Sequence, residues 1–130
     1  MPVLEAPAKV EVKYHDKFNK LIEAAQKHPP AKTAIAHPCD QVSLESAVKA
    51  AALKLIEPIL VGPEQRIRAV ASENKLDISP FEIVDAAHSH DSAAKAVQLV
   101  REGRAEALMK GSLHTDEIMA AVVARDTGLR

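Results

Sequence analysis

Short apolar runs alternate with longer amphipathic segments along the chain, and this pattern predicts four strands that are each followed by a helix. The strands are predicted at residues 33–36, 58–61, 81–84 and 106–109. Such runs, without polar residues at every second position, are typical of strands whose two faces are both covered. Between them, apolar residues recur every three or four positions, which is the period of an amphipathic helix.

Five helices are predicted, one before the first strand and one after each strand. The first begins at Asp16, ends before two prolines, and has an apolar face formed by Phe18, Leu21, Ile22 and Ala25. The second is expected over about residues 41–55. Ser89 or Asp91 is expected to cap the start of the fourth helix, and Gly103 is expected just past its end.

The alternation of strands and helices with short connections indicates the fold class. Right-handed crossovers between successive strands give a parallel sheet with helices on both of its faces. We therefore expect a three-layer α/β domain (αβα) with a parallel sheet over residues 14–130. Residues 1–13 contain Pro2 and Pro7 and show no clear period, which predicts a loose N-terminal arm.

Composition and charge narrow the class of partner. Of the 130 residues, 47% are hydrophobic, which is enough for a buried core, but only 2% are aromatic, which provides no platform for stacking bases. The 17 basic and 18 acidic residues are spread along the chain and give a net charge of -1. No polybasic surface is therefore expected for nucleic acid or anionic lipid.

The cysteine content and the apolar runs indicate the compartment. Cys39 is the single cysteine, so no internal disulfide can form. The N-terminus lacks the pattern of a signal peptide, and no apolar run approaches the ~18 residues that span a bilayer. We expect a cytoplasmic protein with no membrane partner.

Chemistry is expected at the edge of the sheet where the strands end. In an open parallel sheet the loops after all strands share one edge, and ligands bind there, at the point where the crossover direction reverses. Four of the six histidines fall in these loops. The residues at this edge are His37, Cys39, Gly62, Asp85, His88, His90 and residues 110–115.

The loop after the fourth strand, residues 110–115, has the composition of an anion site. Lys110 carries a positive charge, and Gly111 allows close approach of the backbone. Ser112 and Thr115 offer hydroxyl donors where a helix begins. The same pattern fits an ordinary turn in which Thr115 caps the helix, Lys110 is solvated and Ser112 only turns the chain. Spacing alone leaves the two interpretations open.

A metal site is one alternative for this edge. Imidazole and thiolate groups bind zinc, and the candidate ligands are His37, Cys39, His88, His90 and His114. The spacing is weak evidence, because His-x-His and His-x-Cys occur here without a second paired motif. Histidines in loops also cap helices or form hydrogen bonds, and we expect no bound metal.

Nucleophilic catalysis is a second alternative. Ser112 has His114 two residues away, and Cys39 has His37 at the same separation, so each has a possible base nearby. The residues around Ser112 do not form the G-x-S-x-G elbow of hydrolases. A small, partly buried side chain at a helix start is the simpler interpretation of Cys39.

Several segments resemble the phosphate acetyltransferase and phosphate butyryltransferase family, in particular the transferase portion of the bifunctional enoyl-CoA hydratase/phosphate acetyltransferase. They are His37-Pro38-Cys39-Asp40 with the helix of residues 43–52, Pro58-Ile59-Leu60-Val61-Gly62, Ala107-Leu108-Met109-Lys110-Gly111-Ser112-Leu113-His114-Thr115, and Gly128-Leu129-Arg130. The likeness covers most of the chain from about Tyr14 onward. Its most specific part is the strand and turn that end at Thr115.

The resemblance implies an activity and a fold. It implies exchange of an acetyl or other short acyl group between coenzyme A and inorganic phosphate, with coenzyme A as substrate and with no cofactor, metal or covalent enzyme intermediate. The implied fold is of the isocitrate and isopropylmalate dehydrogenase type, with two α/β domains and the active site in the cleft between them. A homo-oligomer is also expected.

The resemblance further implies which residues face phosphate. They are Lys110, Gly111, Ser112, His114, Thr115 and, near a charged group of the family's site, Arg130. Family members continue well past the segment that matches Arg130, and their catalytic Ser, Arg and Asp lie in that continuation. We therefore expect the N-terminal part of an acyltransferase, inactive alone and without an assigned catalytic residue. The alternative is a non-catalytic binding or oligomerisation domain.

Overall fold

A computed structural model describes residues 17–129, so the predicted arm at residues 1–13 and the start of the first helix lie outside the described residues. The elements follow the predicted order: β1 (Ala31–Ala36), α2 (Gln41–Ala52), β2 (Ile56–Gly62), α3 (Glu64–Glu73), β3 (Glu82–Asp85), α4 (Ser89–Arg101), β4 (Ala107–Lys110) and α5 (Thr115–Val123). Each predicted strand is confirmed to within two residues at either end. None of the helices described is long and apolar enough to cross a membrane.

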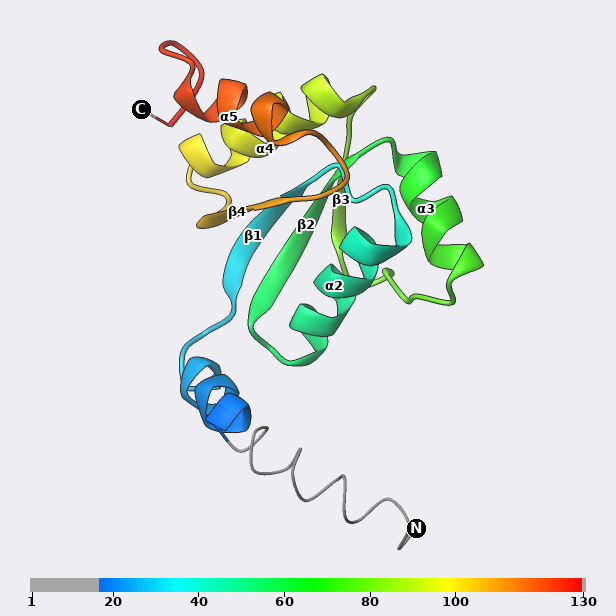
Figure 1. Cartoon of the computed structure of the whole chain (residues 1–130), viewed down its shortest axis with the longest axis vertical. Helices are drawn as coiled ribbons and strands as arrows, with labels where there is room; N and C mark the ends of the chain where they lie inside the picture. The colour runs from blue at the N-terminus through cyan, green and yellow to red at the C-terminus, as the bar shows by residue number, and fades with distance from the viewer. Residues whose placement is uncertain (1–16, 130) are drawn as a thin grey trace, which may run out of the picture.

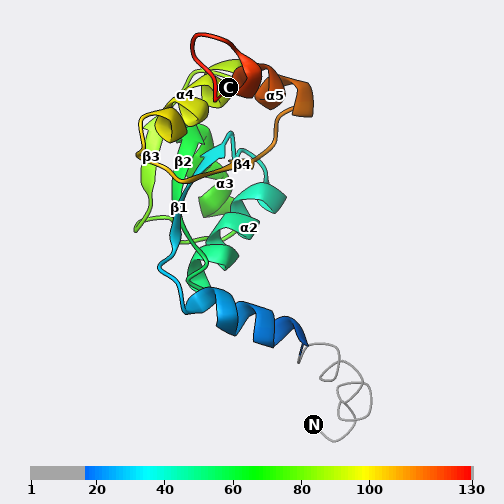
Figure 2. The ribbon, with the colours of Figure 1, turned by 90° about the vertical axis from the view of Figure 1, so that its left-hand side faces the viewer.

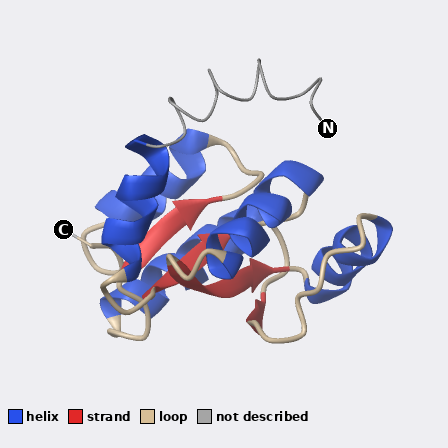
Figure 3. Ribbon diagram, turned by 90° about the horizontal axis from the view of Figure 1, so that it is seen from below, coloured by secondary structure: helices blue, strands red, loops and turns tan. Residues whose placement is uncertain are grey.

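The four strands form one parallel sheet in the order β3-β2-β1-β4 (Figure 1). β1 pairs with both β2 and β4, so that Ala36 is aligned with Val61 on one side and with Lys110 on the other. Helices α2 and α3 pack on one face of the sheet, and α4 and α5 pack on the other. Figure 3 shows helices on both sides of the strands. The predicted α/β class, with a parallel sheet covered on both faces, is confirmed.

The core is divided into two halves by the sheet, because successive strand residues point to opposite faces. Ala36 lies in the half beneath α4 and α5, where the fully buried Ala96 lets helix and sheet approach closely. The next residue back along β1, Ile35, lies in the other half with Leu44 of α2 and Ile67 of α3. These two layers hold the strand ends, and hence the loops that follow them, in fixed positions.

Three helices end in the same way, and only one of these ends is marked by glycine. Gly103 follows α4 with φ 80°, as predicted, whereas Lys54 after α2 and Lys75 after α3 adopt φ 61° and 55°. Leu55 N–H then donates to Ala50 O at 3.0 Å, which is the long hydrogen bond of a Schellman motif. For this reason α2 ends at Ala52 and not near residue 55.

The start of α4 differs from the prediction. The N-cap is His88, whose Nδ1 accepts from Asp91 N–H at 3.2 Å. Asp91 lies one turn inside the helix, and its Oδ2 accepts from Ala87 N–H at 2.9 Å. Ser89 and Asp91 are therefore wrong as caps, because the histidine before them supplies the accepting atom.

Residues 17–26 form the predicted first helix, but its apolar face is not buried. Figures 1 and 2 show this helix beyond one end of the sheet, away from the other helices. Phe18 and Leu21 are 56% and 69% exposed, and Gln26 Nε2 donates to Leu53 O at 2.5 Å. The apolar period predicts the helix correctly. It does not predict that the apolar face stays exposed. Residues 28–30 connect this helix to the start of β1, and the helix lies beyond that end of the sheet, where neither helical layer covers it.

Candidate functional site

The loops after β1 and β4 lie side by side at the carboxyl end of the sheet. From β1 the chain crosses to β2 and β3 on one side, and it then returns over the sheet to β4 on the other side (Figure 1). The neighbouring strands β1 and β4 therefore form the topological switch point, where ligands of open α/β sheets bind. This is the edge at which the sequence predicts chemistry.

The backbone after β4 remains hydrogen-bonded to the loop after β1. Gly111 N–H donates to Ala36 O at 2.8 Å, and Ser112 N–H donates to His37 O at 2.7 Å. A Cβ atom on Gly111 would lie 2.5 Å from both carbonyl oxygens, well inside van der Waals contact. Only glycine allows the two loops to approach this closely.

The Ser112 hydroxyl also joins the two loops. Its Oγ donates to His37 O at 2.9 Å and accepts from Cys39 N–H at 3.1 Å. A hydroxyl has a single hydrogen, and here a backbone carbonyl takes it. Ser112 would have to release His37 O before it could donate to an anion.

An open hollow of about 580 Å³ lies above these loops, and we call it the β1–β4 hollow. It brings together four of the residues predicted to face phosphate, Lys110, Gly111, Ser112 and His114. Residues outside that set also line it. They are His37, Asp40, Arg66, Ser89, Leu113 and Glu117.

Of the two remaining predicted residues, Thr115 is not among those that line the hollow. Thr115 is the first residue of α5, and the N-cap position is held by His114 with extended backbone angles. The interpretation of Thr115 as the helix cap is therefore wrong. No side chain caps the start of α5, which leaves its first backbone N–H groups beside the hollow. Arg130 lies outside the described residues.

Arg66 reaches the hollow from α3, and the sequence reasoning missed it. One signal was present, because Arg66 is the third residue of a helix that starts at the same sheet edge. A cation in the first turn of a helix lies unfavourably against the helix dipole. In the described part of the chain, Arg66 has no ion-pair or hydrogen-bond partner, whereas Arg68 pairs with Glu64 at 2.9 Å.

The other charges of the hollow have internal contacts. Lys110 Nζ lies 3.4 Å from Gly111 O. Hydrogen bonds from Ser43, and to a smaller extent the Lys110 charge, hold the pKa of Asp40 below its usual value. A hydrogen bond from Ser89 is the main cause that lowers the pKa of Glu117. The two cations therefore face two carboxylates that remain ionised at neutral pH.

His37 is the most unusual residue of the hollow. Its backbone has φ 63°, a left-handed conformation that is uncommon for residues with a side chain. The side chain is only 8% exposed, and Nδ1 lies 2.9 Å from Ser92 Oγ at the start of α4. Burial is the main cause that lowers the pKa of His37, and the nearby Arg66 charge adds to it.

The nucleophile alternative finds no support in this geometry. Cys39 is 4% exposed, and burial raises the pKa of its thiol, so the reactive thiolate is disfavoured. The Ser112 hydroxyl bonds to the backbone of the neighbouring loop and is not bonded to a histidine ring.

The metal alternative requires several ligands at one point. Over residues 17–129, no three His, Cys, Asp or Glu side chains are grouped so that they could hold a metal ion. The rings of His88 and His90 are edge to face with centroids 6.2 Å apart, and His88 Nδ1 is already used as the cap of α4.

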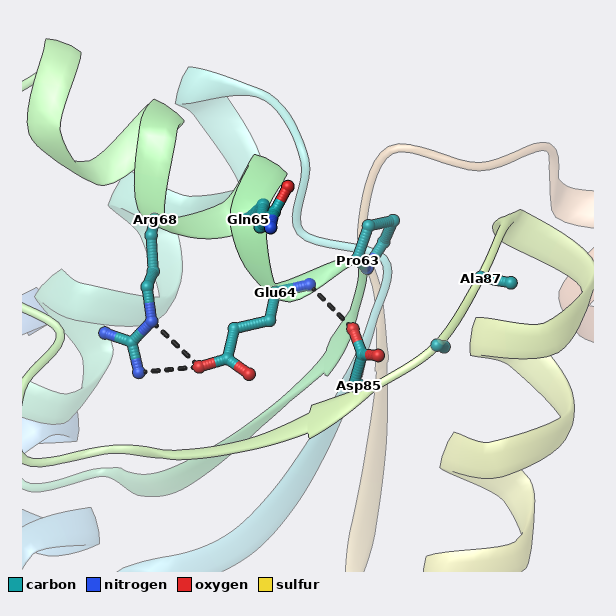
Figure 4. Close-up of a pocket in the computed structure, with 7 residues that line it drawn as sticks. Pro63, Glu64, Gln65, Arg68, Asp85 and Ala87 are labelled. Atoms are coloured by element: carbon teal, nitrogen blue, oxygen red, sulfur yellow. Dashed lines mark hydrogen bonds and ion pairs between the residues drawn. The ribbon is translucent and has the colours of Figure 1, made fainter.

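A second hollow, of about 530 Å³, lies at the ends of β2 and β3 (Figure 4). Its charged groups satisfy one another. Asp85 Oδ1 accepts from Glu64 N–H at 3.0 Å, and the Glu64 carboxylate pairs with Arg68. Figure 4 shows this chain of contacts along one wall. Arg68 is therefore already paired within the chain, whereas Arg66 in the β1–β4 hollow has no such partner among the described residues.

Asp40→Ala is expected to lower the free energy of unfolding by about 1 kcal/mol at neutral pH, because Asp40 Oδ1 caps α2 by accepting from Ser43 N–H at 2.9 Å. The folded-state pKa of Asp40 is below its ordinary value of 3.8. The contribution is therefore complete above that ordinary value and is lost as the pH falls through the folded-state pKa. Urea unfolding over a pH series should show the difference between the two proteins shrinking in acid.

Asp40→Asn is the matched control, since asparagine also caps helices. It should retain most of the stability at neutral pH while removing the acid-dependent part. A loss from Asp40→Ala that is equal at every pH would contradict the assignment.

The known proteins with similar sequences are all named as phosphate acetyltransferases or phosphate butyryltransferases. No protein-family model matches the chain. The chain is 60% identical over 114 residues to the phosphate acetyltransferase of Rhizobium meliloti, which covers 88% of this chain and 36% of the relative. It is 45% identical over 113 residues to the phosphate acetyltransferase of Rickettsia felis (87% and 32%). It is 34% identical over 113 residues to the phosphate butyryltransferase of Clostridium beijerinckii (87% and 37%).

Solved structures share the fold at low sequence identity. The EutD phosphotransacetylase from Staphylococcus aureus matches with a TM-score of 0.64 at 16% identity, over 83% of this chain and 43% of that one. A phosphotransacetylase from Streptococcus pyogenes matches with a TM-score of 0.68 at 15% identity, over 81% and 41%. The resemblance predicted from the sequence is therefore confirmed: this chain is related to the phosphate acetyltransferases and phosphate butyryltransferases, and it spans about a third of the length of the curated relatives it matches.

Proposed function

We propose that the β1–β4 hollow is the phosphate side of an acyltransferase that exchanges an acetyl or other short acyl group between coenzyme A and inorganic phosphate. One observation carries the proposal. Arg66 from the first turn of α3 and Lys110 from the end of β4 line the same hollow at the switch point of the sheet. The names of the relatives at 60% and 45% identity supply the reaction class.

The groups of the hollow suit a multiply charged oxyanion. Arg66 offers a planar fork of N–H donors, and Lys110 offers a compact charge on a flexible stem. The uncapped start of α5 adds backbone N–H groups and the positive end of the helix dipole. Gly111 lets the loops approach closely, and His114 stands where the loop meets the helix.

In the proposed reaction a phosphate oxygen attacks the carbonyl carbon of the thioester. The carbon–sulfur bond then breaks, so the acyl group moves to phosphate and coenzyme A leaves. Fixed cations orient the nucleophile and stabilise the negative charge that develops on the carbonyl oxygen. Coenzyme A is a substrate in this scheme, and no cofactor is needed. The described residues act by position and charge, since the Ser112 hydroxyl and the Cys39 thiol are both engaged or buried.

We place the acyl pocket and much of the coenzyme A site in the part of the relatives that this chain does not match. Together with that part, the enzyme is proposed to act in the cytoplasm as a homo-oligomer. The single cysteine supports the compartment, because a chain without disulfides suits a reducing environment.

A chimaera tests the proposal. Residues 17–129 of this chain would replace the matching third of the Rhizobium meliloti phosphate acetyltransferase, whose sequence is 60% identical. We expect the chimaera to form acetyl phosphate from acetyl-CoA and phosphate at a rate comparable with that of the parent. The parent enzyme is the positive control, and the parent without its own segment is the negative control.

A non-catalytic docking domain is the second candidate, and exposed apolar side chains on and after α5 favour it. Met119, Val123 and Leu129 are 48%, 47% and 39% exposed. The chimaera separates the two candidates. A folded chimaera that binds acetyl-CoA but produces no acetyl phosphate would contradict the acyltransferase proposal and favour docking.

A further inference from the structure

The orientation of the His37 ring is fixed by a short chain of hydrogen bonds. Ser92 Oγ donates its single hydrogen to His88 O at 2.9 Å, one turn back at the start of α4. The same oxygen lies 2.9 Å from His37 Nδ1. Because the serine hydrogen is already used, the remaining contact requires that Nδ1 carries a hydrogen and donates it to Ser92. In the neutral ring, Nε2 is then a pure acceptor.

This acceptor has no partner in the described part of the chain. The hydrogen bond of the His37 ring is made through Nδ1, and Nε2 is not among the buried polar atoms that lack a partner. Nε2 is therefore not completely buried, although the side chain as a whole is more than nine-tenths buried. The solvent-filled space that His37 lines is the β1–β4 hollow.

Charged groups from three sides act on this ring. Burial and the Arg66 charge on α3 lower the pKa of His37, as does His88 before α4, while Glu117 on α5 raises it. The net effect lowers the pKa of His37, with burial as the largest cause and the Arg66 charge next, so the neutral ring is favoured. Lys110 and Asp40 also line the hollow. An anion drawn in by Arg66 and Lys110 would thus meet a lone pair at Nε2.

We infer that His37 determines which anion the hollow accepts, by requiring that the anion itself carries a hydrogen. This inference rests on the proposed function and names the form of its substrate. Hydrogen phosphate has an O–H group that can donate to Nε2. Sulfate has the same shape but carries no hydrogen near neutral pH, so it would leave Nε2 facing an oxygen lone pair, and a desolvated acceptor without a donor is costly.

Charge alone predicts the opposite preference. Near neutral pH sulfate is fully doubly charged, whereas part of the phosphate carries one charge less, so two cations by themselves would favour sulfate. A preference for phosphate would therefore show the effect of the acceptor at His37 Nε2, because the charges of Arg66 and Lys110 alone would favour sulfate. This contrast makes the two anions a sharp pair of probes.

The test is a titration of the 130-residue chain with inorganic phosphate and with sulfate at constant ionic strength and neutral pH. Long-range ¹H–¹⁵N spectra report the hydrogen on each histidine nitrogen. We expect the Nδ1–H form for free His37, a shift of its Nε2 resonance with phosphate only, and about tenfold tighter binding of phosphate than of sulfate, as for one hydrogen bond to a charged group.

Two variants separate the role of His37 in anion preference from an effect on the stability of the fold. His37→Asn suits the left-handed backbone, since asparagine tolerates positive φ, and removes the acceptor. Ser92→Ala keeps the α4 helix but releases Nδ1, so the ring should populate both neutral forms. In both variants the affinities for phosphate and for sulfate should become nearly equal. The urea-unfolding midpoint of at least Ser92→Ala should stay near that of the unaltered chain. His90→Ala, at an exposed ring on the same helix, is the control that should leave the preference unchanged.

The outcomes are distinct. Equal binding of phosphate and sulfate by the unaltered chain, or a preference that survives both variants, would overturn the role of His37 and leave the proposed anion site standing. Failure of both anions to shift any resonance of the hollow would overturn the phosphate site itself, and the inference with it.

Discussion

Gly111→Ala is expected to lower the free energy of unfolding by about 3 kcal/mol or more, because overpacking against rigid backbone is among the most destabilising single changes. The added Cβ would lie 2.5 Å from Ala36 O and from His37 O. Neither oxygen belongs to a flexible side chain, so β1 and β4 would have to separate at their carboxyl ends. Urea unfolding followed by circular dichroism measures the change.

The matched control is Gly103→Asn, because Gly103 is needed for its backbone conformation and not for close approach of the backbone. Gly103 has φ 80°, and a Cβ atom added there would have no atom of a non-adjacent residue within 4 Å. Asparagine tolerates this backbone conformation, so the change should cost less than about 1 kcal/mol. Similar losses at the two positions would show that the close approach at Gly111 does not matter. The Gly111 variant should also lose phosphate binding, since the hollow is built on this contact.

Removing both cations of the hollow is expected to have the largest effect on phosphate. Each of Arg66→Gln and Lys110→Gln should weaken phosphate binding about tenfold, and the double variant about a hundredfold, if each provides one charge-assisted hydrogen bond. In the chimaeric acyltransferase the effect should appear in the KM for phosphate, with a much smaller change in the KM for acetyl-CoA.

Arg68→Gln is the control for Arg66→Gln. It removes the same charge from the same helix, two residues further along, where the arginine is paired with Glu64. It should leave the KM for phosphate nearly unchanged, and raising the salt concentration should weaken phosphate binding by the unaltered protein more than by the double variant. Equal effects of Arg66→Gln and Arg68→Gln would show that Arg66 acts only through the overall positive potential of the surface and not by direct contact with phosphate.

The sequence predicts the layered fold well, because the fold depends on periodicity. Residues 33–36 and 58–61 have no internal polar alternation, and both runs lie in strands covered on two faces. The ends of helices are less predictable. Lys54 and Lys75 occupy left-handed positions that sequence rules assign to glycine or asparagine. Backbone hydrogen bonds close these two helix ends, from Leu55 N–H to Ala50 O and from Leu76 N–H to Ala71 O, and no local residue type signals them.

The site is only partly predictable for a similar reason. The turn from Lys110 to His114 carries its own signal of charge, glycine and hydroxyl. Arg66 belongs to a helix whose apolar residues read as an ordinary core face, so only the sheet order brings it to the hollow. The hydroxyl of Ser112 bonds to a residue 75 positions away, a contact that spacing within the turn cannot reveal. The assignment of Ser112 to phosphate stays a prediction.

That separation of 75 residues between His37 and Ser112 also bears on how the chain folds. Contacts between distant parts of a chain carry a larger loop-closure entropy and tend to slow folding. The strands β1 and β2 are joined by a much shorter connection and can pair before β4 arrives. The hollow therefore exists only after the longest loop has closed, and an anion that binds it stabilises the completed sheet over every earlier stage of folding.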